Sequence, residues 1–210
     1  MNYLDYLRTD KFPHFWCSGC GNGIVLCAIA RAFEELDLTL ENTVVVTGIG
    51  CWGKADDYVR TNSFHGTHGR ALAFATGIKL ANPSLNVVVL MGDGDGITIG
   101  GNHFIHAARR NVDVTAILVN NFNYGMTGGQ YSGTTPEERI TTTSRYGHIE
   151  EGFDICAVAK AAGARYVARA STENPQQLKN LIRDGIKKQG FACIEAISPC
   201  PTPVSYTHLR

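Results

Sequence analysis

Short apolar runs alternate along this chain with segments of helical periodicity. The runs at residues 87–91 and 114–119 are typical of strands buried on both faces. Further strands are expected at 43–47, 165–168 and 191–197, and helices at 23–36, 69–81, 102–110, 154–162 and 175–188. This alternation predicts an α/β fold, a three-layer sandwich around a mainly parallel sheet with right-handed crossovers.

Two segments interrupt the pattern. Residues 51–63 have no sustained period and are predicted to form a functional loop. Residues 124–152 are rich in Gly, Thr and Ser, and a loop of that length inside a compact domain is usually functional or a partner contact.

Length and composition narrow the class of protein. A chain of 210 residues can bury one sizeable core, so residues 1–202 are predicted to form a single domain. Lys+Arg 19 balance Asp+Glu 19, which argues against a nucleic-acid or anionic-membrane partner. We find neither a transmembrane run nor a signal peptide pattern. Seven cysteines then indicate a metal or redox role in the cytoplasm rather than a disulfide framework.

Polar residues follow the two best-defined apolar runs. Gly92-Asp93-Gly94 comes directly after residues 87–91, and Asn120-Asn121 ends the run at 114–119. If both strands are parallel neighbours, Asp93 and Asn121 meet at one carboxyl edge of the sheet, where open α/β sheets bind ligands. One carboxylate with neutral oxygens and a substrate phosphate suits Mg²⁺. The alternative is two ordinary turns, in which Asp and Asn are common.

The cysteines admit three interpretations. Cys17 and Cys20 form a C-x-x-C motif, to which Cys51 and Cys200 add thiols from distant positions. A thioredoxin-like pair should follow a strand, and residues 12–16 make a poor one. Structural zinc usually takes two closely spaced pairs, whereas an iron–sulfur cluster tolerates dispersed ligands. The remaining thiols lie within apolar patterns and are expected to be small core residues: Cys27, Cys156 and Cys193.

Glycine-rich segments mark further candidate ligand contacts. Residues 48–53 match G-x-G-x-x-G, but no acidic residue follows at the distance that dinucleotide binding requires, so we reject that function. The amides around Ile49 can still approach a phosphate or a cofactor ring, with Lys54 placed over a carboxylate. His68, at the start of a predicted helix, suits an anionic ligand, whereas His65 is as well explained by capping or surface charge. Thr127 lies in a glycine-rich turn that is either a pyrophosphate cradle or an ordinary turn.

Taken in order, these motifs resemble the β subunit of the 2-oxoacid:ferredoxin oxidoreductases, most closely the 2-oxoglutarate type. The resemblance covers residues 12–202 and rests on W-C-S-G-C-G at 16–21, G-I-G-C at 48–51, H-G-T-H-G-R at 65–70, G-D-G-D at 92–95, N-N at 120–121, Y-G-M-T-G-G-Q at 124–130 and S-P-C-P at 198–201. It implies a thiamine-diphosphate-binding fold that holds thiamine diphosphate, Mg²⁺ and a [4Fe–4S] cluster.

The resemblance also assigns residues. The implied Mg²⁺ ligands are Asp93, Asn121 and the backbone carbonyl of Asn123, and the implied cluster ligands are Cys17, Cys20, Cys51 and Cys200. Lys54 and His68 are the candidate catalytic residues. Candidate cofactor contacts are Ile49, Gly50, Cys51, Trp52, His68, Gly94, Asp95, Gly125, Met126 and Thr127. Trp52 departs from the family, in which a small residue is expected beside the cysteine.

The activity that the resemblance implies is oxidative decarboxylation of a 2-oxoacid, in the first place 2-oxoglutarate, to its acyl-CoA and CO₂. Electrons pass to ferredoxin, CoA is a substrate, and a partner α subunit in a heterodimer supplies the glutamate that activates the thiamine. Lys54 or Arg70 is expected to bind the second carboxylate of a dicarboxylic substrate. Alternatives are a branched-chain 2-oxoacid or pyruvate as substrate, a non-oxidative thiamine enzyme subunit, or a binding module without activity. Residues 203–210 do not resemble the family's continuation and are predicted to be a non-native or disordered tail.

Overall fold

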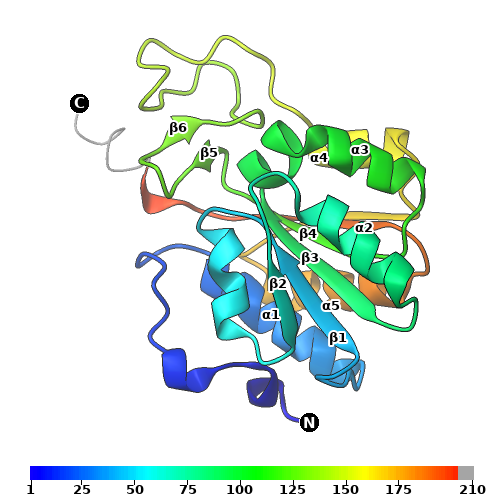
Figure 1. Ribbon diagram of the computed structural model, residues 1–210. Coiled ribbons are helices and arrows are strands. Elements are labelled where there is room, and N and C mark those ends of the chain that lie inside the picture. Colours follow the sequence, from blue (N-terminus) through cyan, green and yellow to red (C-terminus); the bar gives the residue numbers. More distant parts are fainter. Residues whose placement is uncertain (203–210) are drawn as a thin grey trace.

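The computed structural model describes residues 1–202, which form a parallel sheet between two layers of helices (Figure 1). The predicted tail, 203–210, lies outside the described residues. The six-stranded sheet has the order β2-β1-β3-β4-β8-β7, and every pair in it is parallel. Its strands are β1 (Thr43–Thr47), β2 (Asn62–His65), β3 (Asn86–Gly92), β4 (Thr115–Asn120), β7 (Tyr166–Ser171) and β8 (Ala192–Ile197). The predicted α/β sandwich around a parallel sheet is therefore confirmed.

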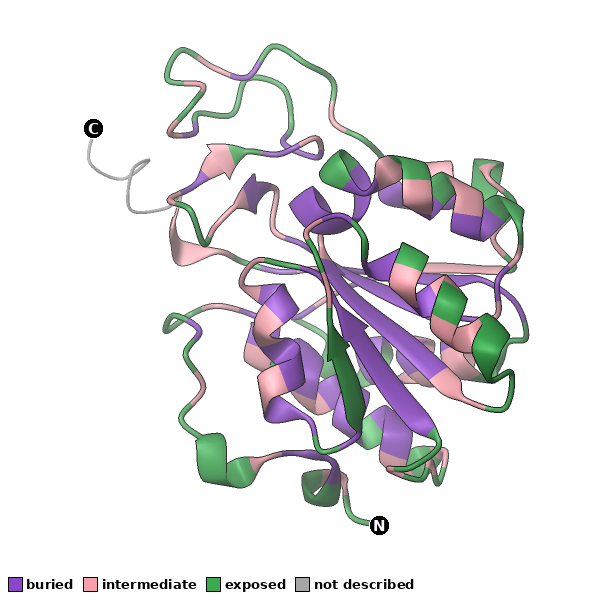
Figure 2. Cartoon of the chain, in the orientation of Figure 1, coloured by how far each residue is buried: buried purple, intermediate pink, exposed green. Residues whose placement is uncertain are grey.

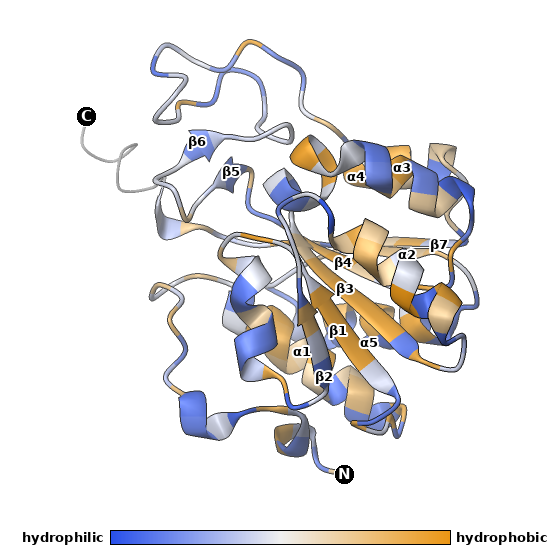
Figure 3. Cartoon of the chain, viewed as in Figure 1, coloured by the Kyte–Doolittle hydropathy of each residue, from blue (hydrophilic) through white to orange (hydrophobic). Residues whose placement is uncertain are grey.

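Helices cover both faces of this sheet. One face packs against α1 (Asn22–Glu35) and α5 (Pro175–Lys187). The other packs against α2 (Ala71–Ala81), α3 (Gly101–Arg109) and α4 (Ile155–Ala161). Successive residues of a strand point to opposite faces, so Val45 and Val88 belong to the first core, whereas Val44 and Val87 belong to the second. The central strands are buried on both sides for this reason, as the continuous apolar runs predicted (Figures 2 and 3).

Shorter elements fill the connections. They are the 3₁₀ helices η1 (Tyr3–Tyr6), η2 (Thr9–Lys11) and η3 (Trp52–Tyr58), the π-helical η4 (Gly94–Ile99), and the strands β5 (Asn123–Tyr124) and β6 (Gln130–Tyr131), which form a small antiparallel pair. The prediction of a loop at 51–63 is wrong in part, because η3 and the start of β2 lie there. All four residues of β2 are exposed at the sheet edge (Figure 2), so this strand has no apolar pattern.

The strand order reverses between β1 and β3. After β1 the chain passes through η3 to β2 on one side, then returns through α2 to β3 on the other side. Such a reversal leaves a crevice at the carboxyl ends of the two strands. Among residues 1–202, no helix is both long and apolar enough to cross a bilayer.

Candidate functional site

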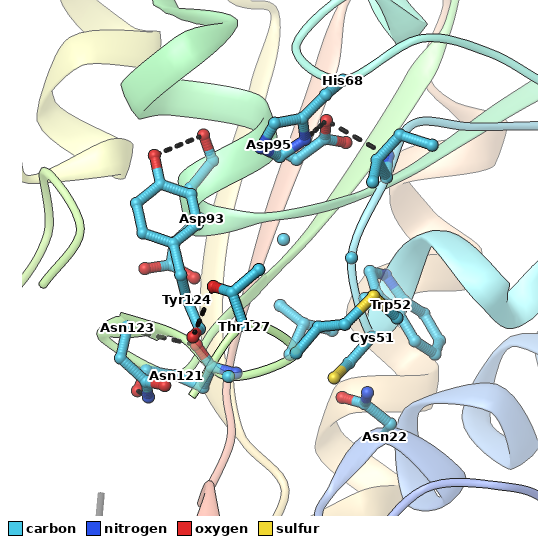
Figure 4. A pocket seen from close by; sticks show the side chains of 17 residues that line it. Asn22, Cys51, Trp52, His68, Asp93, Asp95, Asn121, Asn123, Tyr124 and Thr127 are labelled. Atoms are coloured by element: carbon cyan, nitrogen blue, oxygen red, sulfur yellow. Dashed lines mark hydrogen bonds and ion pairs between the residues drawn. The ribbon is translucent and has the colours of Figure 1, made fainter. Parts of the chain in front are cut away.

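A pocket opens at this crevice, beyond the carboxyl ends of β1, β3 and β4 (Figure 4). Residues from the four connections that follow β1, β2, β3 and β4 meet in it. The parallel pairing of Gly92 in β3 with Val119 in β4 brings the last two of these connections together. It is lined by these residues singled out in the sequence: Ile49, Gly50, Cys51, Trp52, His68, Asp93, Gly94, Asp95, Asn121, Asn123, Gly125, Met126 and Thr127. The structure therefore brings these candidate cofactor and Mg²⁺ residues together.

Asp93 is held rigidly at the tip of β3. It is 2% exposed, and its Oδ2 accepts hydrogen bonds from Ser132 Oγ at 2.5 Å and from Thr134 Oγ1 at 2.7 Å. Burial raises the pKa of Asp93 to about 6, although both hydroxyl donors act in the opposite direction. The ionised carboxylate is thus unfavourably buried until a positive charge approaches it.

The asparagines at the tip of β4 form a tight turn. Phe122 has a left-handed backbone with φ of 62°, and its N–H donates to Asn120 Oδ1 at 3.1 Å. The Asn123 backbone N–H donates to Asn121 Oδ1 at 3.3 Å, and the Asn123 side chain donates to the Asn121 carbonyl at 2.7 Å. The turn thereby holds the oxygens of Asn121 and Asn123 at the pocket next to Asp93 (Figure 4).

Asp95 and His68 form a second polar group in the pocket. Asp95 Oδ1 accepts from the Gly69 N–H at 2.6 Å and from His68 Nδ1 at 2.8 Å. Because a carboxylate only accepts, Nδ1 of His68 carries the proton and Nε2 is the ring nitrogen left for a ligand. Asp95 Oδ2 is buried and has no hydrogen-bond partner within the described part of the chain. An orphaned buried oxygen at a pocket indicates a ligand that donates to it.

The pocket wall leaves no room for a side chain at Gly94. A Cβ at Gly94 would overlap the ring of Tyr124, whose hydroxyl donates to the Gly94 carbonyl at 3.4 Å. Burial, followed by the charges of Asp93 and Asp95, raises the pKa of Tyr124, which keeps its hydroxyl protonated.

Two polar side chains of the pocket were missed from the sequence. Tyr124 lies within the motif at 124–130, where its position beside the glycines was the available signal. Asn22 begins α1 directly after the C-x-x-C segment, and its Oδ1 is buried without a hydrogen-bond partner in residues 1–202.

The four candidate cluster cysteines gather on one side of the pocket. Cys51 lines it, and Cys200 Sγ donates to Asn123 Oδ1 at 3.8 Å. Burial, followed by the charges of Cys200, Cys20 and Cys17, raises the pKa of Cys51 to about 11. Burial also raises the pKa of Cys20, and the charges of Cys200 and Cys17 add to that shift. Because one thiol affects the pKa of another only at short range, these shifts indicate that the four sulfurs lie near one another.

The spacing of these thiols differs from that of a zinc site. No three of them lie within 4.8 Å of one another in the part of the chain that the structure describes. Two thiolates on one zinc are at most about 4.6 Å apart, twice a Zn–S bond. Of the other cysteines, Cys193 is fully buried, as expected for a core residue, and Cys27 and Cys156 are half-buried.

The predicted substrate cations lie outside the pocket. Lys54 is in η3, and its ammonium pairs with Asp57 at 2.7 Å. Arg70 is exposed and donates to the His68 carbonyl at 3.1 Å. His65 contacts Asp56 at 3.1 Å and does not line the pocket. Trp52, in contrast, is buried and packs against Trp16, with 5.7 Å between ring centroids.

The pocket lies where the strand order reverses, and it combines a buried carboxylate, an asparagine turn and glycine-rich walls. These features define a cofactor-dependent α/β enzyme of the thiamine type. Comparison with known proteins agrees: residues 46–196 match the C-terminal TPP binding domain of thiamine pyrophosphate enzymes. The chain is 54% identical to the 2-oxoglutarate synthase subunit KorB of Methanothermobacter marburgensis over 95% of its length and 70% of the relative's. It is 43% identical to subunit beta of 2-oxoacid:ferredoxin oxidoreductase 2 from Aeropyrum pernix, over 96% of this chain and 64% of that one.

A solved structure gives the same result. The 2-oxoglutarate:ferredoxin oxidoreductase of Magnetococcus marinus, which has 2-oxoglutarate, coenzyme A and succinyl-CoA bound, superposes with a TM-score of 0.93 at 40% identity. The match covers 96% of this chain and 69% of that one. The chain belongs to the β subunits of the 2-oxoacid:ferredoxin oxidoreductases, as its motifs predicted.

Proposed function

We propose that this chain binds the thiamine cofactor in an enzyme that converts 2-oxoglutarate and CoA to acyl-CoA and CO₂ and passes electrons to ferredoxin. The names of the relatives and the ligands of the Magnetococcus marinus structure support this substrate. The observation that carries the proposal is the meeting of Asp93, Asn121 and Asn123 in one pocket with four cysteines beside it.

The cation and the diphosphate belong at the tips of β3 and β4. Asp93, Asn121 and the carbonyl of Asn123 would hold Mg²⁺, with Thr127 and the Gly125 amide near the diphosphate. The donor set fits, since it offers one carboxylate and neutral oxygens. None of the described lining residues is Lys or Arg, so a divalent cation is the natural partner for the buried carboxylate.

The thiamine end of the cofactor belongs between β1 and His68. When bound, thiamine diphosphate supplies the carbanion that adds to the keto carbon and stabilises the charge left by loss of CO₂. Ile49 and Met126 expose apolar surface in the pocket, which would bury the rings and exclude water. Asp95 holds His68 so that Nε2 is presented to the reacting end.

The four thiols are assigned to a [4Fe–4S] cluster. No three of their sulfurs in the described part of the chain lie as close together as ligands of one zinc ion, whereas a cluster of four irons spreads its ligands more widely. When bound, such a cluster accepts electrons one at a time and hands them on. All seven cysteines are free, which suits the reducing cytoplasm to which we assign the protein.

A second subunit completes the site. Thiamine activation needs a carboxylate beside the aminopyrimidine, and no glutamate is among the described residues that line the pocket. The partner α subunit is assigned this glutamate, and the chain on its own is predicted to be inactive.

Recognition of the second substrate carboxylate is assigned to Lys54. Its ammonium is on the surface and, among residues 1–202, pairs with the partly exposed Asp57, so it can exchange partners when substrate and the α subunit are present. Arg70 is the alternative cation, because it is exposed beside His68.

The test is co-expression with an α subunit and anaerobic assay with 2-oxoglutarate, pyruvate and branched-chain 2-oxoacids, with a viologen as acceptor. We expect CoA-dependent viologen reduction fastest with 2-oxoglutarate and none from the chain alone. Lys54→Ala should lower kcat/KM for 2-oxoglutarate by roughly tenfold, the loss of one ion pair, but not for pyruvate. Lys160→Ala, on α4, is the matched control. Release of CO₂ without viologen reduction would instead support the non-oxidative alternative.

A further inference from the structure

A line of hydrogen bonds, buried from Glu195 onward, runs from the far end of the sheet to Asp93. It begins at Arg169 on β7, whose Nε donates to Glu195 Oε2 at 2.7 Å. Glu195, on β8, is 1% exposed, and its other oxygen accepts from Nδ2 of Asn120 at 2.8 Å. Asn120 is the last residue of β4, is 2% exposed and does not line the pocket.

Glu195 determines which way the Asn120 amide faces. A carboxylate only accepts hydrogen bonds, so the nitrogen of Asn120 must point toward Glu195 and the oxygen must point away from it. That oxygen accepts from the Phe122 N–H at 3.1 Å and lies 3.0 Å from Thr134 Oγ1, whose single proton it shares with Asp93 Oδ2. A reversed amide would turn its oxygen toward a carboxylate and lose the bond from Phe122.

The two contacts of the Asn120 oxygen lead to the two halves of the cation site. The bond from Phe122 closes the turn that carries Asn121 and Asn123. Thr134 Oγ1 is also 2.7 Å from Asp93 Oδ2, so Asn120 and Asp93 together define the position of this hydroxyl. One side chain outside the pocket therefore supports both the amide ligands and the carboxylate ligand.

We propose that Asn120, oriented by Glu195, is the positioning residue of the Mg²⁺ site. The inference rests on the proposed function, which assigns Mg²⁺ to Asp93, Asn121 and Asn123. Asn120 acts through Phe122 and Thr134 without touching the cation. Outer partners that orient metal ligands typically contribute about 10- to 100-fold in metal affinity.

The other end of the network has no separate metal function. Asp154, Cys156 and Glu195 place ligand atoms within 4.8 Å of one another. The guanidinium of Arg169 already pairs there with Asp154 at 2.6 Å as well as with Glu195. Its charge takes the place of a cation, and its effect is to hold the Glu195 carboxylate toward Asn120.

The experiment measures Mg²⁺ binding by titration calorimetry in the assembled complex with the α subunit, stripped by chelation and resupplied with thiamine diphosphate. Asn120→Asp sets a second carboxylate against Glu195 and should raise the Kd for Mg²⁺ by about tenfold or more. Asn42→Asp makes the same chemical change just before β1, at the amino ends of the strands and so away from the pocket. It should leave the Kd unchanged.

A pair of variants at Thr134 separates positioning from packing. Thr134→Val keeps the volume but removes the hydroxyl, and should weaken Mg²⁺ binding. Thr134→Ser keeps the hydroxyl but loses a methyl group, and should bind Mg²⁺ as the wild type does. If serine is the weaker binder, the residue acts by packing and the inference is overturned. This pair tests the hydroxyl that joins Asn120 to Asp93 even if Asn120→Asp does not fold.

Asp93→Asn distinguishes failure of the inference from failure of the proposed function. If this variant binds Mg²⁺ as tightly as the wild type, the proposed cation site itself is wrong. If it loses Mg²⁺ binding while Asn120→Asp and Thr134→Val keep full affinity, the site stands and the positioning role is refuted.

Discussion

On one side of the pocket, the candidate Mg²⁺ ligands lie at the tips of two paired central strands, and Asp93 is buried with two hydroxyl donors on one oxygen. On the other side, the candidate cluster ligands come from three connections outside the sheet, and Cys17 is exposed. Few bonds join those connections: Gly21 N–H donates to the Pro199 carbonyl at 3.4 Å, and Trp16 Nε1 donates to the Cys51 carbonyl at 2.6 Å.

This difference indicates two ways of building a metal site. The sheet determines the cation side in advance, since strand pairing and buried hydrogen bonds position the oxygens without a ligand. If the four thiols hold the proposed cluster, the cysteine side depends on it, because thiols on loosely joined segments gain their final geometry when the metal binds. Perturbing each side separately tests whether the two sides differ in this way.

The largest effect is expected from Cys51→Ser in the assembled complex. The variant removes a thiolate ligand, so it should lose bound iron and viologen reduction. Thiamine diphosphate and Mg²⁺ should still bind within a factor of about 3, because a hydroxyl fits where a thiol did and the oxygens of the cation side are untouched. Iron analysis and calorimetry measure both sides.

Cys27→Ser, in α1, is the matched control and should retain iron and activity. Loss of thiamine diphosphate binding in Cys51→Ser, with Cys27→Ser normal, would mean that the two sides form one cooperative unit and that the comparison is wrong.

A smaller effect is expected in amide hydrogen exchange when each ligand is removed in turn. Removing the cluster should speed exchange at residues 17–21, which few backbone bonds join to the rest of the described chain. Removing Mg²⁺ and thiamine diphosphate should leave β3 and β4 protected, because their N–H groups are bonded within the sheet. Equal loosening of both sides by either treatment would contradict the proposed difference.

The two sides also differ in how far the sequence predicts them. Residues 87–91 and 114–119 are continuous apolar runs, so the strands, their parallel pairing and the nearness of Asp93 to Asn121 follow from general rules. The donors Ser132 and Thr134 come from a loop without periodicity, about which such rules say nothing. β2 was missed because it is an edge strand held by its bonds to β1 rather than by apolar burial.

The partners of polar and charged side chains were equally hard to predict from the sequence. Lys54 is a predicted substrate cation because of its place after the glycines, and the glycine motif does not reveal its partner in the structure, Asp57. The partners of Asn120 include Glu195, 75 residues away, and no spacing along the chain reveals that pairing. The motifs identified residues that line the pocket, whereas the residues that orient them became visible only in three dimensions.

The smallest effect concerns the anchorage of α1, which begins directly after the C-x-x-C segment. Glu35, at its end, pairs with Lys179 and, at 3.2 Å, with Arg183, both on α5. The hydrogen bond from Lys179 lowers the pKa of Glu35, so its contribution to stability is present above the unfolded pKa of about 4.3 and is lost as the pH falls through the folded value.

We therefore expect Glu35→Gln to speed amide exchange in α1 of the complex at pH 7. The free energy of local opening should fall by less than about 1 kcal/mol, because the pair is partly exposed. The difference from wild type should shrink in acid, as the pH falls through the lowered folded pKa of Glu35. Glu34→Gln, the neighbouring change, should match the wild type at pH 7 and in acid. A difference that persisted in acid would mean that Glu35 holds α1 by packing rather than by charge, and the cysteine side would then be anchored more firmly than the comparison implies.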